Sequence, residues 1–273
     1  MSLDLFKKLP FIQNYVRQLE ALETETDRLR QKCLDLETKL AQCDYLPVPP
    51  RALRVRVGGW EETDHFLGVG RKIRWDLNKL LKGVDKNLNS FQSILDFGCG
   101  CGRVLRFLKP IKGQTIIGSD IDSESIQWCQ QHLSSLATFK VNHDLPPLPY
   151  PDASFDFIYS ISVFTHLPEE MQLQWLEELN RVLKVGGFFI TTAHSKALIP
   201  VELPDEVFTQ FQQQGFYYLK GGGTNGLPDY YQTAFHSHAY IQNHWSRYFK
   251  IINIQTRGIN NHQDSIICQK VAH

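Results

Sequence analysis

The N-terminal part of the chain carries a helical pattern of apolar positions. Apolar side chains recur there at alternating intervals of four and three residues, with threonine in one position. These positions are Tyr15, Leu19, Leu22, Thr26, Leu29, Cys33, Leu36, Leu40 and Cys43. This spacing is the heptad pattern of a coiled coil, and charged residues occupy the other faces. Residues 15–43 are therefore predicted to form a coiled coil that makes the chain a homo-oligomer. The alternative is a single helix packed on its own domain.

A second helical pattern follows a proline-rich stretch. Pro47, Pro49 and Pro50 end the first helix and predict a stiff linker. Apolar residues at helical spacing then run from Phe66 to Leu81. Residues 47–89 are thus predicted to be a linker and helices that precede the first strand.

From residue 90 the chain alternates short apolar runs with helical segments. The runs predicted as strands are Ser93–Asp96, Thr115–Asp120, Ala137–Val141, Phe155–Ser160, Phe188–Ala193, Phe249–Thr256 and Asp264–Lys270. The segments predicted as helices are Val104–Leu108, Ser123–Ser135 and Pro168–Leu183. This alternation predicts an α/β fold with a largely parallel sheet. Residues 195–247 are less regular and are rich in aromatic residues, histidine and glycine.

The first two predicted strands each end in an acid. Asp96 is followed by glycines at 98, 100 and 102, which allow a sharp turn and bring backbone N–H groups close to a ligand. The Asp96 carboxylate suits a ligand with a positive amino group. Asp120 can accept hydrogen bonds from both hydroxyls of a ribose, whereas Asp122 is placed to cap the next helix. These residues predict a nucleoside cofactor.

The stretch from Asp96 to Gly102 resembles the first motif of the class I S-adenosylmethionine-dependent methyltransferases, in its D-x-G-x-G-x-G form. An acidic proline-rich loop at residues 143–150 and a Phe-Asp pair at the fourth strand follow in the order of that family. Residues 181–187 resemble its R-V-L-K-P-G-G element, with valine at the proline position. Their agreement over residues 90–194 makes the resemblance specific, and the chain is similar to bacterial methyltransferases of types 11, 12 and 25.

The resemblance implies a Rossmann-like, doubly wound, seven-stranded mixed sheet with its last strand antiparallel, preceded by the coiled coil. It also implies a division of the chain into an N-terminal helix (1–46), a linker and helices that cap the cofactor (47–89), and a methyltransferase domain (90–273). Residues 195–247 are then an insertion that forms a substrate lid.

The implied cofactor is S-adenosyl-L-methionine. Its implied binding residues are Asp96, Gly98, Cys99, Gly100, Gly102, Asp120, Ile121, Asp144, Leu145 and Ser160. On this resemblance Ile121 covers the adenine, Asp144 accepts from its exocyclic amine and the Leu145 N–H donates to the ring. Arg71, Lys72 or Arg74 either reaches the methionine carboxylate or belongs to a solvated basic face.

Several histidines are candidates for a general base. A sulfonium methyl is strongly electrophilic, so the enzyme must align a nucleophile with it, and a hydroxyl acceptor also needs its proton removed. His166 is the first candidate because the loop after the fourth strand faces the methyl group in this family. His236 and His238 in the insertion and His194 after the fifth strand follow. For each of them a structural role is the alternative.

The acceptor is predicted only by analogy. Three stretches, namely Val57–Gly59, the glycine turn and Ser162–Leu167, together resemble bacterial methyltransferases that act beside glycan-assembly enzymes. This resemblance favours a sugar hydroxyl of a glycan or glycolipid. A natural-product O- or N-methyltransferase is an alternative, and a non-catalytic scaffold that oligomerises through its coiled coil is another. A nicotinamide-binding turn is excluded because it needs glycine at Arg103.

Composition limits the partners and the compartment. Lys and Arg together number 29, as do Asp and Glu, which disfavours nucleic acid as a partner. The six cysteines lack the paired spacing of a metal site, and Cys99 and Cys101 are interpreted as small residues in a tight turn. No apolar run is long enough for a membrane span and no signal-peptide layout is present, so the chain is expected to be cytoplasmic with free thiols.

Overall fold

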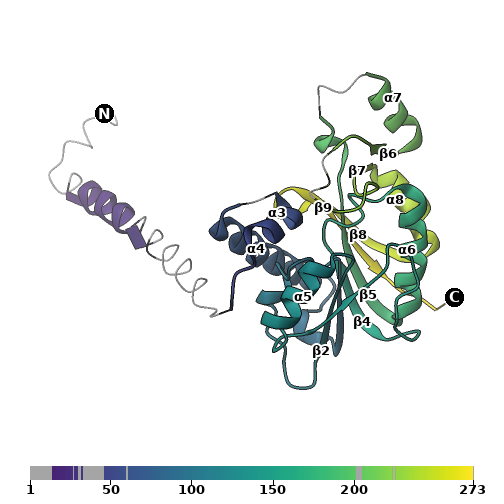
Figure 1. Cartoon of the computed structure of the whole chain (residues 1–273). Coiled ribbons are helices and arrows are strands. Elements are labelled where there is room, and N and C mark those ends of the chain that lie inside the picture. The colour runs from purple at the N-terminus through teal and green to yellow at the C-terminus, as the bar shows by residue number, and fades with distance from the viewer. Residues whose placement is uncertain are drawn as a thin grey trace. The chain divides into compact units, whose positions relative to one another are not determined.

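The chain divides into two compact units, Met1–Leu46 and Pro47–His273. The computed structural model describes residues 14–26, 28–29, 32, 46–59, 61–200, 205–222, 224 and 226–272. In the first unit residues 14–26, 28, 29 and 32 are helical. The other elements all lie in the second unit (Figure 1).

The described part of the predicted coiled coil is a helix with an exposed apolar stripe. Tyr15, Leu19, Leu22 and Leu29 are each more than half exposed. Thr26 donates its hydroxyl proton to the carbonyl of Leu22 in its own helix, at 2.7 Å. The remaining heptad positions, from Cys33 onward, lie outside the described residues. The coiled coil therefore stays a prediction.

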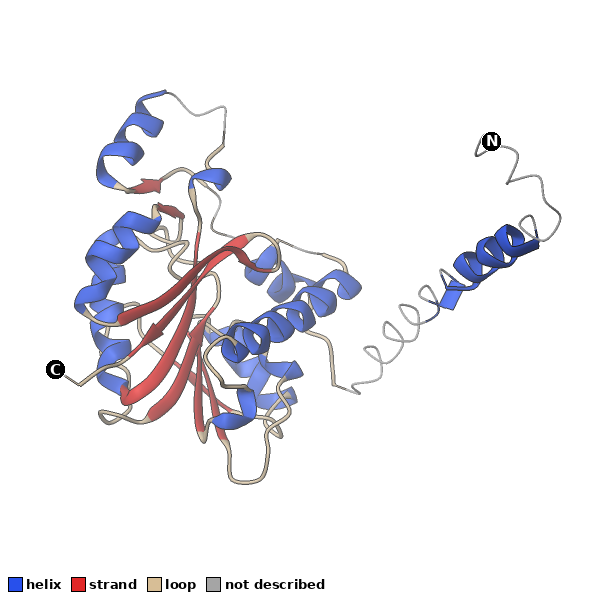
Figure 2. Ribbon diagram, turned by 180° about the vertical axis from the view of Figure 1, so that it is seen from behind, coloured by secondary structure: helices blue, strands red, loops and turns tan. Residues whose placement is uncertain are grey.

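A seven-stranded sheet forms the centre of the second unit (Figure 2). Its strands are β1 (Ser93–Phe97), β2 (Thr115–Asp120), β3 (Thr138–Val141), β4 (Phe155–Ser160), β5 (Leu183–Ala193), β8 (Lys250–Ile259) and β9 (Gln263–Gln269). The spatial order is β3-β2-β1-β4-β5-β9-β8, with β1 to β5 parallel and β9 antiparallel to both of its neighbours. The predicted doubly wound mixed sheet is confirmed.

Helices cover both faces of this sheet (Figures 1 and 2). One face carries α3 (Arg51–Gly58), α4 (Thr63–Lys82) and α5 (Ser123–His132), and the other carries α6 (Glu169–Val182) and α8 (His238–His244). The apolar positions that predict α4, from Phe66 to Leu81, are buried in the structure. Short 3-10 turns occur at η1 (Leu88–Ser90), η2 (Leu105–Phe107), η3 (Lys196–Leu198) and η4 (Trp245–Arg247).

Two segments differ in detail from what the sequence indicated. Residues 51–58, predicted only as part of a linker and helices over residues 47–89, form α3 directly after Pro50. A proline ring fixes φ at a value that suits the start of a helix, so Pro50 begins one helix as well as ending another. The predicted helix from Val104 to Leu108 is only the 3-10 turn η2, because Leu108 is already extended ahead of Lys109 and Pro110.

The described residues of the insertion at 195–247 include a small hairpin. Helix α7 (Asp205–Gln214) packs on strand β6 (Phe216–Leu219), which pairs with β7 (Thr233–His236). The loop before β7 is fastened to the main body because the Gln232 N–H donates to the carbonyl of His166, at 3.0 Å. The insertion therefore lies over the loops that follow β4 and β5.

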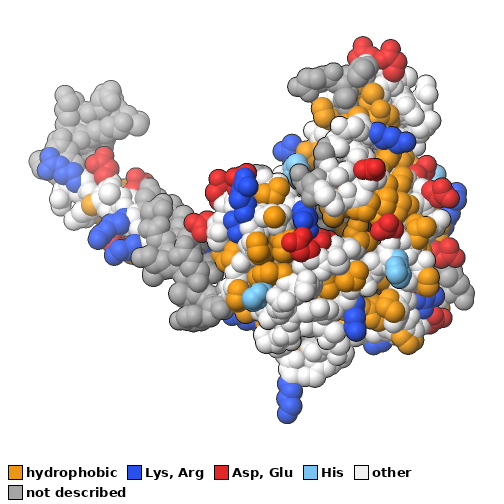
Figure 3. All heavy atoms as spheres, in the orientation of Figure 1, with side chains coloured by type: hydrophobic (Ala, Val, Ile, Leu, Met, Phe, Trp, Pro, Cys, Tyr) orange, Lys and Arg blue, Asp and Glu red, His pale blue; other side chains and the backbone are white. Residues whose placement is uncertain are grey.

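The surface is mixed in charge, as the balanced composition suggests. On the face drawn in Figure 3, basic and acidic side chains are interspersed over the second unit. None of the helices in the described ranges is both long and apolar enough to cross a membrane.

At Gly70, the backbone of helix α4 lies directly against the backbone at the end of the glycine turn. A Cβ atom built on Gly70 would lie 2.0 Å from the carbonyl oxygen of Arg103, whereas a Cβ on the exposed Gly68 would meet none of the described atoms within 4 Å. The two glycines thus share a helix but differ in the space around them.

Replacing Gly70 with alanine is expected to lower the free energy of unfolding by about 1–3 kcal/mol, as overpacking does, because a backbone atom obstructs the new methyl group. Gly68→Ala is the matched control and should raise it by roughly 0.5–1 kcal/mol, because alanine favours a helix. Urea unfolding followed by circular dichroism measures both. Equal effects of the two substitutions would contradict the close approach at Gly70.

Candidate functional site

The glycine turn after β1 leaves no room for a side chain at its three glycine positions. Gly98, Gly100 and Gly102 have φ values of +82°, +51° and +78°, in the left-handed region that favours glycine. A Cβ at Gly98 would lie 2.1 Å from Val163, and one at Gly100 would lie 2.3 Å from Val57. The glycines therefore let the loop after β4 and helix α3 close over the turn.

The N–H groups of Gly98, Cys99, Gly100 and Gly102 donate to acceptors within the protein, which differs from the expectation that the N–H groups of this turn face a ligand. Those of Gly98 and Cys99 donate to the carbonyl of Ser119 on β2, at 2.8 and 3.1 Å. The Gly100 N–H donates to Asp120 Oδ2 at 2.7 Å. The turn contributes shape and close approach, and the side chains around it supply the polar groups.

A cavity lies over the carboxyl ends of β1, β2 and β4, beside the glycine turn. Seven predicted cofactor residues line it: Asp96, Gly98, Cys99, Gly100, Asp120, Ile121 and Asp144. Gly102, Leu145 and Ser160 are not among its lining residues. Gly102 lies against Leu133, the residue that follows α5. The Leu145 side chain is exposed, and Ser160 is fully buried.

Asp96 is buried at the end of β1. Tyr159 on the neighbouring strand β4 donates its hydroxyl proton to Asp96 Oδ2 at 2.7 Å. Burial raises the pKa of Asp96 to about 7, although the bond from Tyr159 opposes this shift. The carboxyl group can therefore exchange a proton near neutral pH.

Asp120 is held by backbone N–H groups from two directions. Its Oδ2 accepts from Gly100 and its Oδ1 accepts from Asp122, at 2.7 and 2.9 Å. Burial raises the pKa of Asp120 to about 6, and these N–H groups partly counteract it. Asp122 caps α5 as predicted, accepting from Glu124 and Ser125.

The lining of the cavity also includes residues that the sequence did not indicate as part of a site. Asn142 lines it and accepts a hydrogen bond from Ser119 Oγ at 2.7 Å. Trp175 lines it as well and donates its indole N–H to the Asp144 carbonyl at 3.1 Å. Burial, with help from the Asp144 carboxylate, raises the pKa of Tyr230, so this phenol stays protonated.

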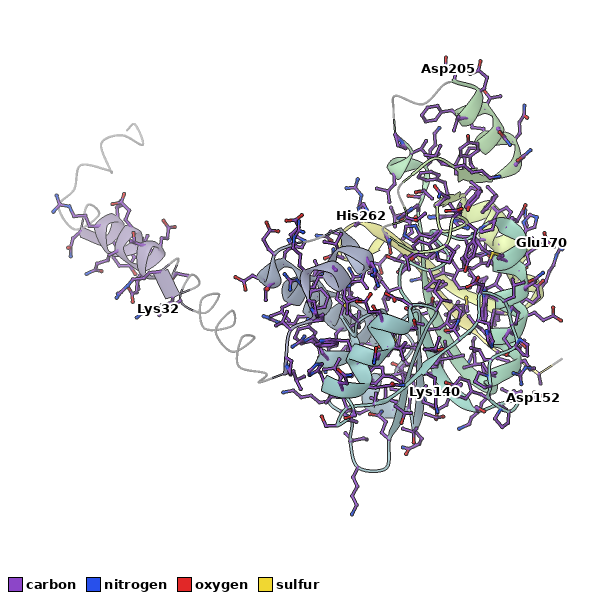
Figure 4. All side chains as sticks on the ribbon, viewed as in Figure 1. Lys32, Lys140, Asp152, Glu170, Asp205 and His262 are labelled. Carbon is purple, nitrogen blue, oxygen red and sulfur yellow. The ribbon has the colours of Figure 1, made fainter. Side chains whose placement is uncertain are left out.

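A second cavity adjoins the first. The two share Arg56, Val57, Arg103, Ile161, Ser162, Leu227 and Tyr231 as lining residues. The second is also lined by His166 and His194, from the loops after β4 and β5. His262 in the β8–β9 turn, labelled in Figure 4, lines it too. Aspartate and glutamate are absent from its described lining, whereas Asp96, Asp120, Asp122 and Asp144 line the first cavity.

His166 is brought to this second cavity with a defined tautomer. Its Nδ1 lies 2.5 Å from the carbonyl oxygen of Gln232, and its ring stacks on Tyr231 with centroids 4.4 Å apart. A carbonyl can only accept, so Nδ1 carries the proton and Nε2 has the lone pair. Burial lowers the pKa of His166, which keeps the ring neutral.

His194 belongs to the same group of rings. Its centroid lies 6.0 Å from those of both His166 and His262. The Gln263 side-chain amide donates to His194 Nε2 at 3.2 Å, and burial lowers the pKa of His194 to about 3. Neither Gln263 nor His262 was singled out from the sequence, since a role for them requires the β8–β9 hairpin to fold back onto β5.

The structure does not bring the two insertion histidines to either cavity. His236 is fully buried, with Nε2 2.8 Å from Gln172 Oε1, and burial lowers its pKa to about 3. His238 lies at the start of α8 and pairs with Asp264 at 2.7 Å. Both positions suit a structural role, the alternative that the sequence left open.

The basic residues at the cavities also differ from those expected. Arg71, Lys72 and Arg74 line neither cavity, and Lys72 pairs with Asp76 on its own helix. Arg56 and Arg103 line both cavities instead. Sequence spacing gave no signal for Arg56, because it reaches the site only through helix α3.

The chain is similar in sequence to known methyltransferases. A family profile described as "Methyltransferase domain" matches residues 94–187. The methyltransferase GfsG of Streptomyces halstedii is 30% identical over 140 residues, which are 49% of this chain and 48% of that protein. A fatty-acid O-methyltransferase of Mycolicibacterium smegmatis is 31% identical over 100 residues, 36% of each chain.

A sterol 24-C-methyltransferase of Gibberella zeae is 27% identical over 178 residues, 61% of this chain and 44% of that protein. The chain thus spans about half or less of the length of these relatives. Among solved structures, the PH0226 protein from Pyrococcus horikoshii aligns with a TM-score of 0.55 and 18% identity, covering 77% of this chain and 92% of that one. That likeness shows the shared fold.

Proposed function

We propose that this chain is a class I S-adenosylmethionine-dependent methyltransferase and that it methylates a hydroxyl group by in-line displacement. The observation that carries the proposal is the junction of two cavities of opposite character. Carboxylates line one of them, and a neutral histidine with an available Nε2 lines the other.

The first cavity suits S-adenosylmethionine by its chemistry. The cofactor has two positive groups, a sulfonium and an ammonium, and only one negative group, a carboxylate, so its net charge is positive. Four aspartates line this cavity and can balance that charge. Both Asp120 oxygens have lone pairs left for ribose hydroxyls after accepting backbone N–H groups. Ile121 supplies an apolar side chain for the adenine and Asp144 an acceptor for its amine.

In the second cavity, the residues of this chain would position the acceptor and take its proton. When bound, S-adenosylmethionine supplies an electrophilic methyl group. His166 Nε2 accepts the proton of the acceptor hydroxyl, while the Gln232 carbonyl keeps Nδ1 protonated. Tyr231 stacks on His166 and borders both cavities, so it holds the base beside the methyl donor.

Two parts of the chain enclose the junction. Val57 of α3 packs over Gly100, which supports residues 47–89 as a cap on the cofactor. Leu227 and Tyr231 of the insertion line both cavities, which supports residues 195–247 as a substrate lid. Exclusion of water by these two segments would protect the methyl donor.

For the acceptor we propose a sugar hydroxyl of a glycan or glycolipid. Polar side chains that can bind sugar hydroxyls line the second cavity, among them Ser162, Gln232, Asn260 and Gln263. Val69, Ile73 and Ile259 line it too, which would also suit a small natural product with an apolar part. An amine acceptor is disfavoured because the described lining offers no carboxylate to bind it.

The cofactor site is tested by calorimetry with S-adenosylhomocysteine. At pH 8, Asp120→Asn is expected to lower its affinity roughly 10- to 100-fold, because hydrogen bonds to a charged carboxylate are lost. The wild-type affinity should also fall below pH 6, since the pKa of Asp120 is about 6 and protonation removes an acceptor. Asp64→Asn, an exposed change on α4, is the control. No binding by the wild-type chain would overturn the proposed function.

The base is tested by transfer of labelled methyl groups to fractionated host extract. His166→Ala should keep the affinity for S-adenosylhomocysteine and lower turnover about a hundredfold, as loss of a general base does. Because burial lowers the pKa of His166, protonation of this ring should slow the wild-type reaction only at a pH below the usual range of a histidine. His238→Ala, outside both cavities, should keep full turnover. A large loss with His238→Ala and none with His166→Ala would move the role to His238.

We also propose that residues 15–43 pair with further copies of the chain. The described apolar positions of this segment are exposed, so self-association would bury them. Light scattering should give a dimer or trimer for the full chain and a monomer after removal of residues 1–45. An unchanged number of chains per particle would contradict the pairing.

A further inference from the structure

The two cavities divide the charged residues unequally. All four lining aspartates face the first cavity, and Asp122 is already paired with Arg56 at 3.0 Å. The second cavity has Arg56, Arg103 and three histidines, and its described lining contains neither aspartate nor glutamate. The acceptor side of the junction is therefore suited to negative charge.

Arg103 is a charged group at this junction that has an electrostatic interaction with Asp96 but no hydrogen bond or ion pair among the described residues. It follows the glycine turn, lines both cavities and is 9% exposed. Arg56 binds Asp122 and Glu124, at 3.0 and 2.7 Å, whereas the Arg103 side chain has no hydrogen bond or ion pair with any residue that the structure describes. Burial without a hydrogen-bonded partner is costly for a guanidinium, so an anion from outside the protein would stabilise it.

We propose that the acceptor carries an acid group, and that Arg103 binds this group while the acceptor hydroxyl faces His166. This inference rests on the methyl-transfer function proposed above. A planar guanidinium binds a carboxylate through two parallel hydrogen bonds, which would also fix the orientation of the acceptor. Uronic acids and hydroxy acids are acceptors of this chemical class.

Electrostatics at the junction favour the acceptor over the cofactor as the source of the acid. A bound methyl donor would bring a positive sulfonium toward the place where the two cavities meet, and Arg103 is positive as well. The aspartates that line the first cavity would be available to balance the net positive charge of that donor. An acid group on the acceptor would balance Arg103 from the side that has no carboxylate.

Matched acid and neutral probes test the inference. The full chain is saturated with S-adenosylhomocysteine and titrated with 4-hydroxybenzoate or 4-hydroxybenzamide, and with glucuronate or glucose, by ligand-observed NMR. Wild-type protein should bind at least one acid roughly tenfold or more tightly than its neutral counterpart, the size expected for a charged hydrogen-bonded pair. Equal binding within both pairs, or no binding of any probe, would overturn the inference.

Variants test whether Arg103 causes the preference for the acid probe over its neutral counterpart. Arg103→Gln should abolish the preference for the acid, and Arg103→Lys should keep part of it because the charge remains. Lys140→Gln removes an exposed charge on β3, outside both cavities, and should change nothing (Figure 4). Persistence of the preference in Arg103→Gln would contradict the assignment.

The cofactor carboxylate is the competing partner of Arg103, and calorimetry separates the two. Arg103→Gln should leave the affinity for S-adenosylhomocysteine within about twofold of wild type. If that affinity falls tenfold while the affinity for 5′-methylthioadenosine, which lacks the amino-acid part, is kept, Arg103 serves the cofactor and the inference fails. Failure of the proposed function is a different result, namely no binding of S-adenosylhomocysteine by the wild-type chain.

Discussion

Close contact between backbones at the glycine turn is the constraint on which the rest of the structure depends. Helix α4 has only a hydrogen atom at Gly70 where it meets the Arg103 carbonyl, and α3 places Val57 against Gly100. A side chain at either glycine would push the N-terminal helices away from the first strand. That displacement would open the cavity and move Arg56 from the end of β2. Shape at the turn thus determines which charges reach the site.

In this geometry, the strands on the two sides of the site contribute different kinds of polar group. The strands β1 and β2 end in acids that burial and backbone N–H groups hold in place, and they form the wall for a positively charged nucleoside. The loops after β4 and β5 carry His166 and His194, which burial keeps uncharged. The site therefore has fixed acceptors on one side and a neutral proton acceptor on the other, at the position where the strand order reverses.

The sequence predicted well what depends on local chemistry. The seven strands, the helix cap at Asp122 and the acids that line the cavity follow from apolar periodicity and from residues placed at strand ends. It could not predict contacts between distant segments. Arg56 needs α3, which the prolines concealed, and Gln263 reaches His194 only because β9 inserts beside β5. The burial of His236 likewise depends on how the insertion packs.

The two hydrogen bonds between Gln232 and His166 affect when the proposed base can act. One residue of the insertion supplies both the N–H that bonds the His166 carbonyl and the carbonyl that bonds its ring. An insertion that moves away to admit an acceptor would take both bonds with it and leave the imidazole free to change tautomer and rotate. His166 would then be held in the tautomer of a base only when the acceptor is enclosed. An open site, filled with water, would hold the methyl donor without an oriented base beside it.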